Sequence, residues 1–462
     1  MVSWSYYVYR RLTKVKGFLL FLVGICCILL WYNNYYSKDG PRDIVYTLPS
    51  DMANKSTIPL ILRWEPISGE GEGKITCGQD VCEVTSNKSR KAEQSIMIYS
   101  FYGSHFKMHD LPLPRRAGDL WALVHEESPK NNHYIFSNLE ILQLFNLTST
   151  FKRQSSYPLT TFGLRDHEKI MDRKFLLTLE EKNRHRKLGL APIVYVQSGC
   201  DAPSDRDKLV FLLQQYIPID SYGRCMKNKD FPKSLSFDND GSMAPMESDE
   251  FYAFLSRYKF ALAFENAVCD DYITEKFWRP IQIGVVPIVF GSPTIKDFLP
   301  DEKSAIITSD YSSVKELADH LWHLDEHDEE FSQHLQFKFS GITNPKLKNF
   351  IEKRDWGRGK AAFDMFTAYT CFLCQTLHDI KREPKKFYKK EFQKVNLSHY
   401  GCPAPLRFDS NGIYNVVDTW WQQEWTFSKY LARAAKYYHD NNEIVSAEKL
   451  NSFAQILYKT GL

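Results

Sequence analysis

A charged pair near the start of one predicted helix, Glu275 and Lys276, is the strongest candidate for chemistry in this chain of 462 residues. A lysine in the first turns of a helix can reach a phosphate held by the free N–H groups of the helix, and a carboxylate beside it can accept hydrogen bonds from sugar hydroxyls. The pair therefore suits a sugar-nucleotide diphosphate. An ordinary solvated Glu-Lys pair on a helix surface is the alternative.

The elements around this pair predict a βαβ unit. Residues 260–264 form a short apolar run, typical of a strand buried on both faces, and a second apolar run at 285–290 is followed by Gly291. Between the two runs, apolar side chains recur at helical spacing from Tyr272 onwards. A turn of this kind lies at the carboxyl end of a parallel strand, where open α/β sheets bind ligands. Its polar side chains are Glu265, Asn266, Asp270 and Asp271.

Further strands and helices alternate along the chain and predict a doubly wound parallel sheet. Arg206 stands at a helix start after a predicted strand and would supply a second cation for a diphosphate, with a surface arginine as the alternative. We expect strands at 95–101, 121–125, 193–197, 217–222 and 304–308, and helices at 170–187, 208–216, 251–257, 314–324 and 420–438.

Two acidic residues, Glu126 and Glu127, follow the predicted strand at 121–125. Pro129 stops the strand, and acidic side chains on a loop fixed by proline are well placed to face a cleft. A solvated acidic turn is the alternative, so the spacing alone leaves the role of these carboxylates open.

Several segments resemble a known family of enzymes. FALAFENAVCDDYITEKFWRP followed by VVPIVFG resembles the donor-binding signature of the animal α-1,3-fucosyltransferases. HEESPKNN, YVQSGCDAPSDRD and DSYG are similar to a divergent branch of that family, associated with protein O-fucosylation of EMI domains. The resemblance spans roughly residues 60–374. It implies an α/β fold of two Rossmann-like domains, of the GT-B type, and inverting transfer of fucose from GDP-β-fucose to an acceptor hydroxyl.

The resemblance also implies roles for individual residues. The ESP tripeptide matches the position of the general base in the family, so Glu127 is the candidate, with Glu126 and His125 as rivals. Ser155 and Ser156 stand where the family usually carries acid, which leaves the identity of the acceptor open. The donor-binding residues expected from the match are Ser198, Arg206, Glu265, Asn266, Tyr272, Glu275 and Lys276.

Two Asp-x-Asp triplets raise the alternative of a metal-dependent glycosyltransferase. Asp238 and Asp240 have flanks that favour a surface turn, whereas Asp205 and Asp207 enclose Arg206, which is better used on phosphate. In the family that the chain resembles, cations of the protein neutralise the leaving GDP. We therefore expect no metal site and no required cofactor.

An apolar segment at 17–36 predicts a single-pass membrane anchor. A basic stretch, residues 10–16, precedes it, which places the amino terminus in the cytosol and the remainder in the lumen of the endoplasmic reticulum or Golgi. A cleaved signal peptide is the alternative, but bulky Trp31 and Tyr32 occupy the edge where small residues are needed.

Cysteines and glycosylation sequons fit an oxidising lumen. Cys371 and Cys374 form a CxxC, and no second CxxC follows at zinc spacing, so disulfides are favoured over a metal. The family resemblance implies Cys77 and Cys82 as the partners, with the connectivity open. Asn-x-Ser/Thr sequons begin at Asn54, Asn87, Asn146 and Asn396.

The charge balance and the segments above complete the expected organisation. With 59 basic and 56 acidic residues, no overall field points to nucleic acid. The expected parts are a cytosolic tail (1–16), the anchor (17–36), a stem (37–57), an acceptor-side domain (58–190), a GDP-fucose-binding domain (191–345) and a C-terminal extension (346–462).

The expected function is transfer of fucose to a glycoprotein acceptor, with Ser or Thr of EMI domains in secreted proteins as the acceptor that the resemblance implies. Two alternatives stay open at this point. One is α-1,3-fucosylation of GlcNAc in N-glycans or Lewis-type glycans. The other, of a different class, is a catalytically silent luminal lectin or chaperone.

Overall fold

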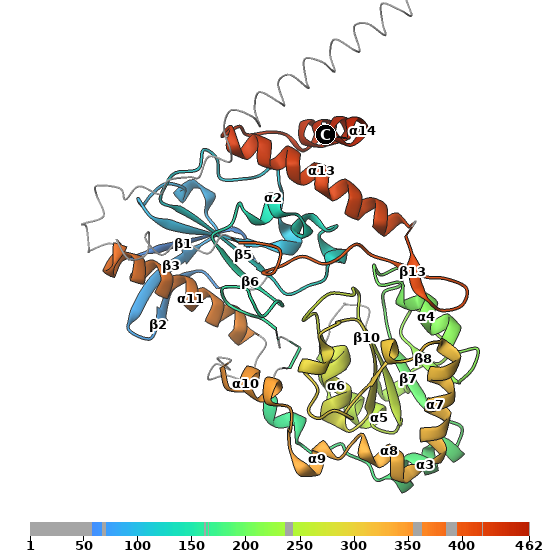
Figure 1. Ribbon diagram of the computed structural model, residues 1–462. Coiled ribbons are helices and arrows are strands. Elements are labelled where there is room, and N and C mark those ends of the chain that lie inside the picture. The colour runs from blue at the N-terminus through green and yellow to red at the C-terminus, as the bar shows by residue number, and fades with distance from the viewer. Residues whose placement is uncertain are drawn as a thin grey trace, which may run out of the picture. The chain divides into compact units, whose positions relative to one another are not determined.

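Two separate sheets, each built mainly of parallel strands, organise the computed structural model of the chain (Figure 1). The structure describes residues 58–66, 71–160, 163–164, 166–235, 244–353, 363–384, 395–417 and 419–461. The sheets come from consecutive parts of the chain, and this observation agrees with the predicted α/β class.

The first sheet has six strands in the order β2-β3-β1-β4-β5-β6. Its strands pair in parallel except for the edge strand β2, which is antiparallel to β3. Strand β5 is completely buried and carries the acidic loop at its carboxyl end. The strands are β1 (Leu60–Glu65), β2 (Gly73–Cys77), β3 (Asp80–Thr85), β4 (Met97–Tyr102), β5 (Asp119–His125) and β6 (Leu147–Thr150).

The second sheet has five parallel strands in the order β11-β10-β9-β7-β8. One hydrophobic core joins its strands to helices α4, α6 and α7. The strands are β7 (Ile193–Val196), β8 (Ile219–Tyr222), β9 (Phe260–Phe264), β10 (Val286–Phe290) and β11 (Ile306–Ile307); the helices among them are α4 (Arg206–Leu213), α5 (Asp249–Leu255), α6 (Glu275–Ile283) and α7 (Val314–Glu326).

Helix α6 begins and ends where its sequence dictates. The side chain of Thr274 caps the amino end by accepting a hydrogen bond from the N–H of Lys276. Gly284 ends the helix in the left-handed conformation, with φ of 71°, which glycine adopts without steric cost. Phe277, Trp278 and Ile281 bury the inner face. The apolar spacing predicted a helix from Tyr272 onwards. The cap at Thr274 explains why the helix starts at Glu275 instead.

The C-terminal part of the chain returns to the first sheet. Helix α11 (Phe363–Arg382) packs against β2, β3 and β4 (Figure 1). Disulfides join Cys77 to Cys371 and Cys82 to Cys374, which confirms the predicted partners and settles their connectivity. Helix α13 (Trp420–Asp440) contacts α2 (Leu139–Leu142) and α14 (Ala447–Thr460).

The remaining described elements are short or peripheral to the two sheets. They are α3 (Leu179–Lys187), α8 (Asp328–Gln333), α9 (Phe337–Ser340), α10 (Pro345–Lys353), β12 (Arg407–Phe408) and β13 (Tyr414–Val416). The helix predicted at 170–187 is therefore too long, because Thr178 and Glu181 form a capping box that starts α3 at Leu179.

Some sequence predictions fall on residues that the structure does not describe. These are the tail, anchor and stem at 1–57, the sequon at Asn54 and the triplet that begins at Asp238. Among the residues that it does describe, no helix is long and apolar enough to cross a membrane.

Candidate active site

Loops from both sheets meet at the carboxyl ends of β5, β7 and β9. Lys130, in the loop after β5, donates from Nζ to the carbonyl of Cys200, in the loop after β7 (2.9 Å). Ser204 of that loop in turn donates from its backbone N–H to the carbonyl of Asn266, after β9 (3.0 Å). The loops that carry the predicted base and the predicted donor residues are therefore in direct contact.

The turn after β9 is built around the buried carboxylate of Glu265, which is 2% exposed. Its Oε1 accepts from the backbone N–H of Thr274 (2.7 Å), and Oε2 accepts from the Thr274 hydroxyl (2.9 Å). A Cβ on Gly291 would lie 2.8 Å from the Cβ of Glu265, so only glycine fits at the end of the VVPIVFG segment. Glu265 thus holds the residue that caps α6.

Lys276 is surrounded by carboxylates. Its Nζ lies 3.1 Å from Oε1 of Glu275 and 3.7 Å from Oε2 of Glu265. Burial alone would lower the pKa of Lys276, but these two anions raise it above its ordinary value. For Glu275, burial is likewise outweighed by the charges of Lys276 and Arg279, and its pKa falls to about 2. Lys276 is therefore a fixed positive charge at the amino end of α6, where anions bind.

The charge of this cation also acts on Glu127. The pKa of Glu127 is raised mainly by burial, while the charge of Lys276 opposes the rise and that of Glu275 adds to it. Glu126 points elsewhere, because its Oε1 accepts a hydrogen bond from the hydroxyl of Tyr102 (2.8 Å). Burial raises the pKa of Glu126 to about 7. Of the two acids, Glu127 is the one that shares the site with the donor loop.

The sequence predicted Arg206 as a cation for a phosphate, and in the structure its guanidinium is held by hydrogen bonds within the protein. Its side chain is 1% exposed, and its Nη1 and Nη2 donate to the carbonyls of Phe264 and Gly199 (3.0 Å each). Its Nε is buried without a hydrogen-bond partner. The guanidinium therefore braces the loops after β7 and β9 and brings a positive charge close to Lys276.

The other predicted donor residues differ in exposure. Ser198 is exposed, and Asn266 is half-buried. Tyr272 is 1% exposed, and its ring packs edge-on against Phe151 with centroids 5.1 Å apart. Tyr272 thus contributes to the packing between the two sheets, whereas Ser198 and Asn266 lie nearer the solvent.

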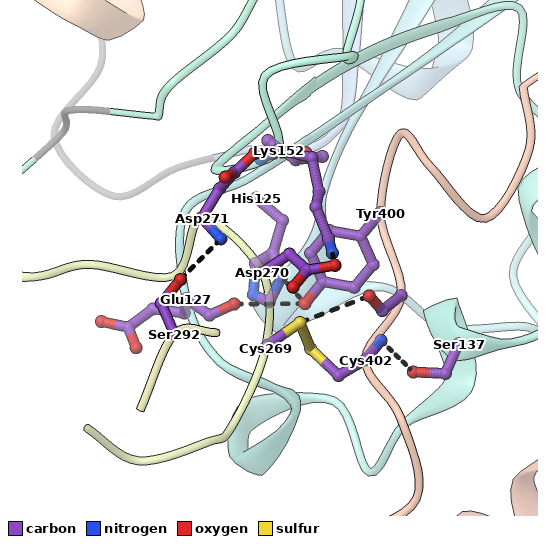
Figure 2. Close-up of a disulfide and its surroundings, with 12 residues drawn as sticks. His125, Glu127, Ser137, Lys152, Cys269, Asp270, Asp271, Ser292, Tyr400 and Cys402 are labelled. Carbon is purple, nitrogen blue, oxygen red and sulfur yellow. Dashed lines mark hydrogen bonds and ion pairs between the residues drawn. A yellow bond between two sulfur atoms is a disulfide. The ribbon is translucent and has the colours of Figure 1, made fainter. Parts of the chain in front are cut away.

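The site includes residues that sequence analysis did not single out. Figure 2 shows Tyr400 beside His125 and the backbone of Glu127, and a disulfide between Cys269 and Cys402 next to it. A fourth disulfide joins Cys200 to Cys225. Their only signal in the sequence was an even number of cysteines beyond the anchor, which does not reveal the pairing.

Clusters with metal-ligand chemistry are few among the described residues. Each of the two that occur contains both sulfurs of a disulfide: Cys82 and Cys374 with His378, and Cys200 and Cys225 with Asp207. Disulfide sulfurs are not the thiolates that zinc requires. In the second Asp-x-Asp triplet, Asp205 accepts from the N–H of Phe408 (2.8 Å). Asp207 accepts from the N–H of Asp201 (2.7 Å).

The three described sequons differ in accessibility. Asn87 and Asn396 are exposed, so the structure leaves them open to modification. Asn146 is 9% exposed, and its Oδ1 accepts from the backbone N–H of Trp121 (2.9 Å). The glycan at Asn146 stays a prediction, and this burial makes the folded chain a poorer substrate for its addition than at the two exposed sequons.

Comparison with known families identifies the class of protein. The model of the N-terminal fucosyltransferase domain matches residues 55–160, and that of glycosyltransferase family 10 (fucosyltransferase), C-terminal part, matches residues 169–394. Together they cover more than half of the chain. The chain belongs to glycosyltransferase family 10, the fucosyltransferases, and is an enzyme of that class.

Individual named relatives and a solved structure are also similar to the chain. The chain is 40% identical over 419 residues to a dog protein named GDP-fucose protein O-fucosyltransferase 3, covering 90% of this chain and 86% of the relative. The human protein of that name is 40% identical over 398 residues, with 85% and 81% covered. A solved alpha1,3-fucosyltransferase with GDP aligns with a TM-score of 0.37 and 16% identity, covering 75% of this chain and 96% of that one.

Proposed function

We propose that this chain transfers fucose from GDP-β-fucose, with inversion, to a hydroxyl group of a protein acceptor. Family membership gives the reaction class, and the dog and human relatives are named as GDP-fucose protein O-fucosyltransferases. The observation that carries the proposal is the contact between the loop after β5, which bears Glu127, and the loops after β7 and β9, the second of which leads to Lys276 on α6.

Glu127 and Lys276 can assist the attacking hydroxyl and the leaving diphosphate, respectively. Glu127 takes the proton from the acceptor hydroxyl as the hydroxyl oxygen attacks the anomeric carbon in line, because a carboxylate with a raised pKa is a better base near neutral pH. Lys276, at the amino end of α6, stabilises the diphosphate as negative charge builds on the leaving GDP. Attack from the face opposite to GDP gives an α-linked product.

The remaining donor contacts follow from the same arrangement. We assign Ser198, Asn266 and Glu275 to contacts with GDP-fucose. Arg206 braces the loops after β7 and β9 and adds positive charge close to the diphosphate. Glu265 and Tyr272 support the loop rather than the ligand. Because charges of the protein surround the diphosphate position, we propose that no metal and no other cofactor is required. The two sheets would then act as the acceptor-side and donor-side halves of a GT-B enzyme.

The acceptor and the cellular location are part of the proposal. Named relatives that act on proteins fit better with a protein acceptor than with GlcNAc of N-glycans or Lewis-type glycans, or with a silent lectin or chaperone. We propose Ser or Thr of EMI domains in secreted proteins as the acceptor. Four disulfides support an oxidising lumen, with the chain held in the endoplasmic reticulum or Golgi membrane as a single-pass type II protein.

The test is transfer by the purified luminal part. It would be incubated with GDP-fucose and a folded EMI domain, with a GlcNAc-terminated glycan, or with no acceptor, and products would be measured by mass spectrometry. Addition of one fucose to the EMI domain supports the proposal. Transfer to the glycan alone would assign the glycan activity instead, and GDP-fucose binding without release of GDP in any arm would indicate a silent protein.

A further inference from the structure

The hydroxyl of Tyr400 lies at the centre of a buried hydrogen-bond network behind the proposed base. Tyr400 belongs to the C-terminal extension and is fully buried, with 0% of its surface exposed. Its Oη lies 3.1 Å from the backbone carbonyl of Glu127, 2.9 Å from Nδ1 of His125 and 2.9 Å from Nδ2 of Asn132. The last residue of β5 and two residues of the loop that follows it thus converge on one hydroxyl from another part of the chain.

The direction of each hydrogen bond follows from the protons available. A carbonyl only accepts, so the single Tyr400 proton points to Glu127, and Asn132 and His125 donate to the tyrosine oxygen. Burial lowers the pKa of His125 to about 3, so the ring is neutral and carries its proton on Nδ1. Its Nε2 then accepts from the hydroxyl of Ser104 (3.1 Å). This assignment gives the hydroxyl and both of its donors a partner.

Tyr400 is held rigidly in this position. Its ring packs against Phe136 and Phe151, with centroids 5.5 Å and 5.2 Å apart. Two residues later, Cys402 donates from its N–H to the hydroxyl of Ser137 (3.1 Å) and forms the disulfide with Cys269 (Figure 2). The disulfide ties this segment to the loop after β9, which leads to Lys276. Tyr400 is therefore tied both to the loop after β5, which carries Glu127, and to the loop after β9, which leads to Lys276.

We propose that Tyr400 is a positioning residue of the transfer reaction: its hydroxyl fixes the backbone of Glu127 and so directs that carboxylate toward the acceptor, and the Cys269–Cys402 disulfide keeps it aligned with the donor loop. The inference rests on the proposed function, in which Glu127 is the base. Loss of the hydroxyl leaves the carbonyl of Glu127 without this donor, and Asn132 Nδ2 and His125 Nδ1, which lie 3.3 Å apart, with only each other, so that the loop relaxes. A base displaced by about 1 Å can lose about 100-fold in rate.

The test is Tyr400→Phe, which removes the hydroxyl and keeps the ring. We expect turnover to fall by about 10- to 100-fold, while affinity for GDP, measured by calorimetry, stays unchanged because Lys276 and its neighbours are untouched. Tyr369→Phe is the matched control. Its hydroxyl is also buried, 3.2 Å from that of Ser100, but it lies on α11 away from the base loop, so turnover should stay at the wild-type value. Normal turnover in Tyr400→Phe would overturn the proposal.

A double variant separates positioning from general stability. If Tyr400 acts through Glu127, adding Tyr400→Phe to Glu127→Gln lowers turnover little further, whereas a purely structural role multiplies the two losses. Should Tyr400→Phe fail to fold, Asn132→Ala is the second variant, expected to lower turnover less but with the same unchanged GDP affinity. Wild-type turnover in folded Asn132→Ala would then overturn the inference. If Glu127→Gln itself turns over normally, the base assignment fails, and with it the proposed function rather than the network alone.

Discussion

Arg153 and Asp271 form a bidentate ion pair that joins the segment after β6 to the loop after β9. The Arg153 Nη2 lies 2.5 Å from Oδ1 of Asp271, and both Nε and the backbone N–H lie 3.0 Å from Oδ2. Asp271 is 1% exposed. Arg153 also donates to Asp297 (2.7 Å), next to the second sheet, so one guanidinium from the first sheet binds two carboxylates beside the second.

Removal of the Asp271 charge should destabilise the junction of the two sheets. We expect Asp271→Asn to lower the free energy of unfolding by about 3 kcal/mol, because it leaves the partly buried Arg153 with only Asp297. The exposed pair of Lys315 and Asp319 is the control, and Asp319→Asn should cost less than about 1 kcal/mol. Denaturant unfolding of both variants makes the comparison. Equal losses would show that the Arg153 pair does not hold the sheets together.

The fold could be predicted where the sequence pattern is local. Strand β9 was expected at its observed bounds, since every residue of Phe260–Phe264 is apolar and buried, as in a central parallel strand. Helix α13 likewise begins at Trp420 as expected, because Thr419 caps it. The Cys77 and Cys82 partners came from the family resemblance, and the structure adds which pairs with which.

The site was harder to predict because its contacts are distant in sequence. The hydrogen bond from Tyr400 to Glu127 joins residues 273 positions apart, and the Cys269–Cys402 disulfide spans 133. No periodicity or spacing encodes such a pair. Arg206 was predicted from its place at a helix start as a second cation for the diphosphate, and that pattern did not show what its guanidinium contacts. In the structure it donates to two backbone carbonyls.

Glu126 should make stability depend on pH. Burial raises its pKa from 4.5 to about 7, so the folded state binds the proton more tightly than the unfolded state. The resulting stability is full below pH 4.5 and is lost as the pH rises to about 7. Glu126→Gln should therefore raise Tm more at pH 8 than at pH 5. Glu302→Gln, at an exposed position, is the control and should change Tm little. The same Tm shift of Glu126→Gln at both would contradict this.

Glycosylation should follow the exposure of the sequons. We expect Asn87→Gln and Asn396→Gln each to remove one glycan from the protein expressed in mammalian cells, seen as a mobility shift that enzymatic deglycosylation abolishes. Asn146→Gln should leave the glycan mass unchanged. It should lower Tm instead, since the longer side chain disturbs the bonds from Trp121 and from Arg115 Nη2 (2.6 Å) to the buried amide. A smaller apparent mass for Asn146→Gln would count against the burial of that sequon.

Chelation should leave activity in place. If cations of the protein neutralise the diphosphate, transfer survives EDTA, although it can fall somewhat, and Asp238→Ala is nearly silent. Asp205 and Asp207 each accept a backbone hydrogen bond, from Phe408 and Asp201, so part of the accepting capacity of each carboxylate is used within the fold. Complete loss of turnover in EDTA that Mn²⁺ restores would instead establish a metal-dependent enzyme.

Substitutions of Glu127 and of Lys276 should impair the enzyme in different ways. Lys276 interacts with the diphosphate before and during transfer, so Lys276→Ala should weaken binding of GDP and GDP-fucose and also lower turnover. Glu127 acts only in proton transfer, which is typically worth about 10² to 10⁴ in rate. Glu127→Gln should therefore keep near-normal GDP affinity while turnover falls by about that range. Calorimetry with GDP and steady-state rates measure both effects.

Glu126→Gln is the matched control for this pair, because Glu126 adjoins Glu127 in the chain but accepts a hydrogen bond from Tyr102. Its effect on turnover should be milder than that of Glu127→Gln. Were Glu127→Gln to turn over normally while Glu126→Gln is inactive, the base would be the neighbouring acid. Glu127 would then serve in binding rather than in proton transfer, and its loss would appear in the affinity for GDP-fucose.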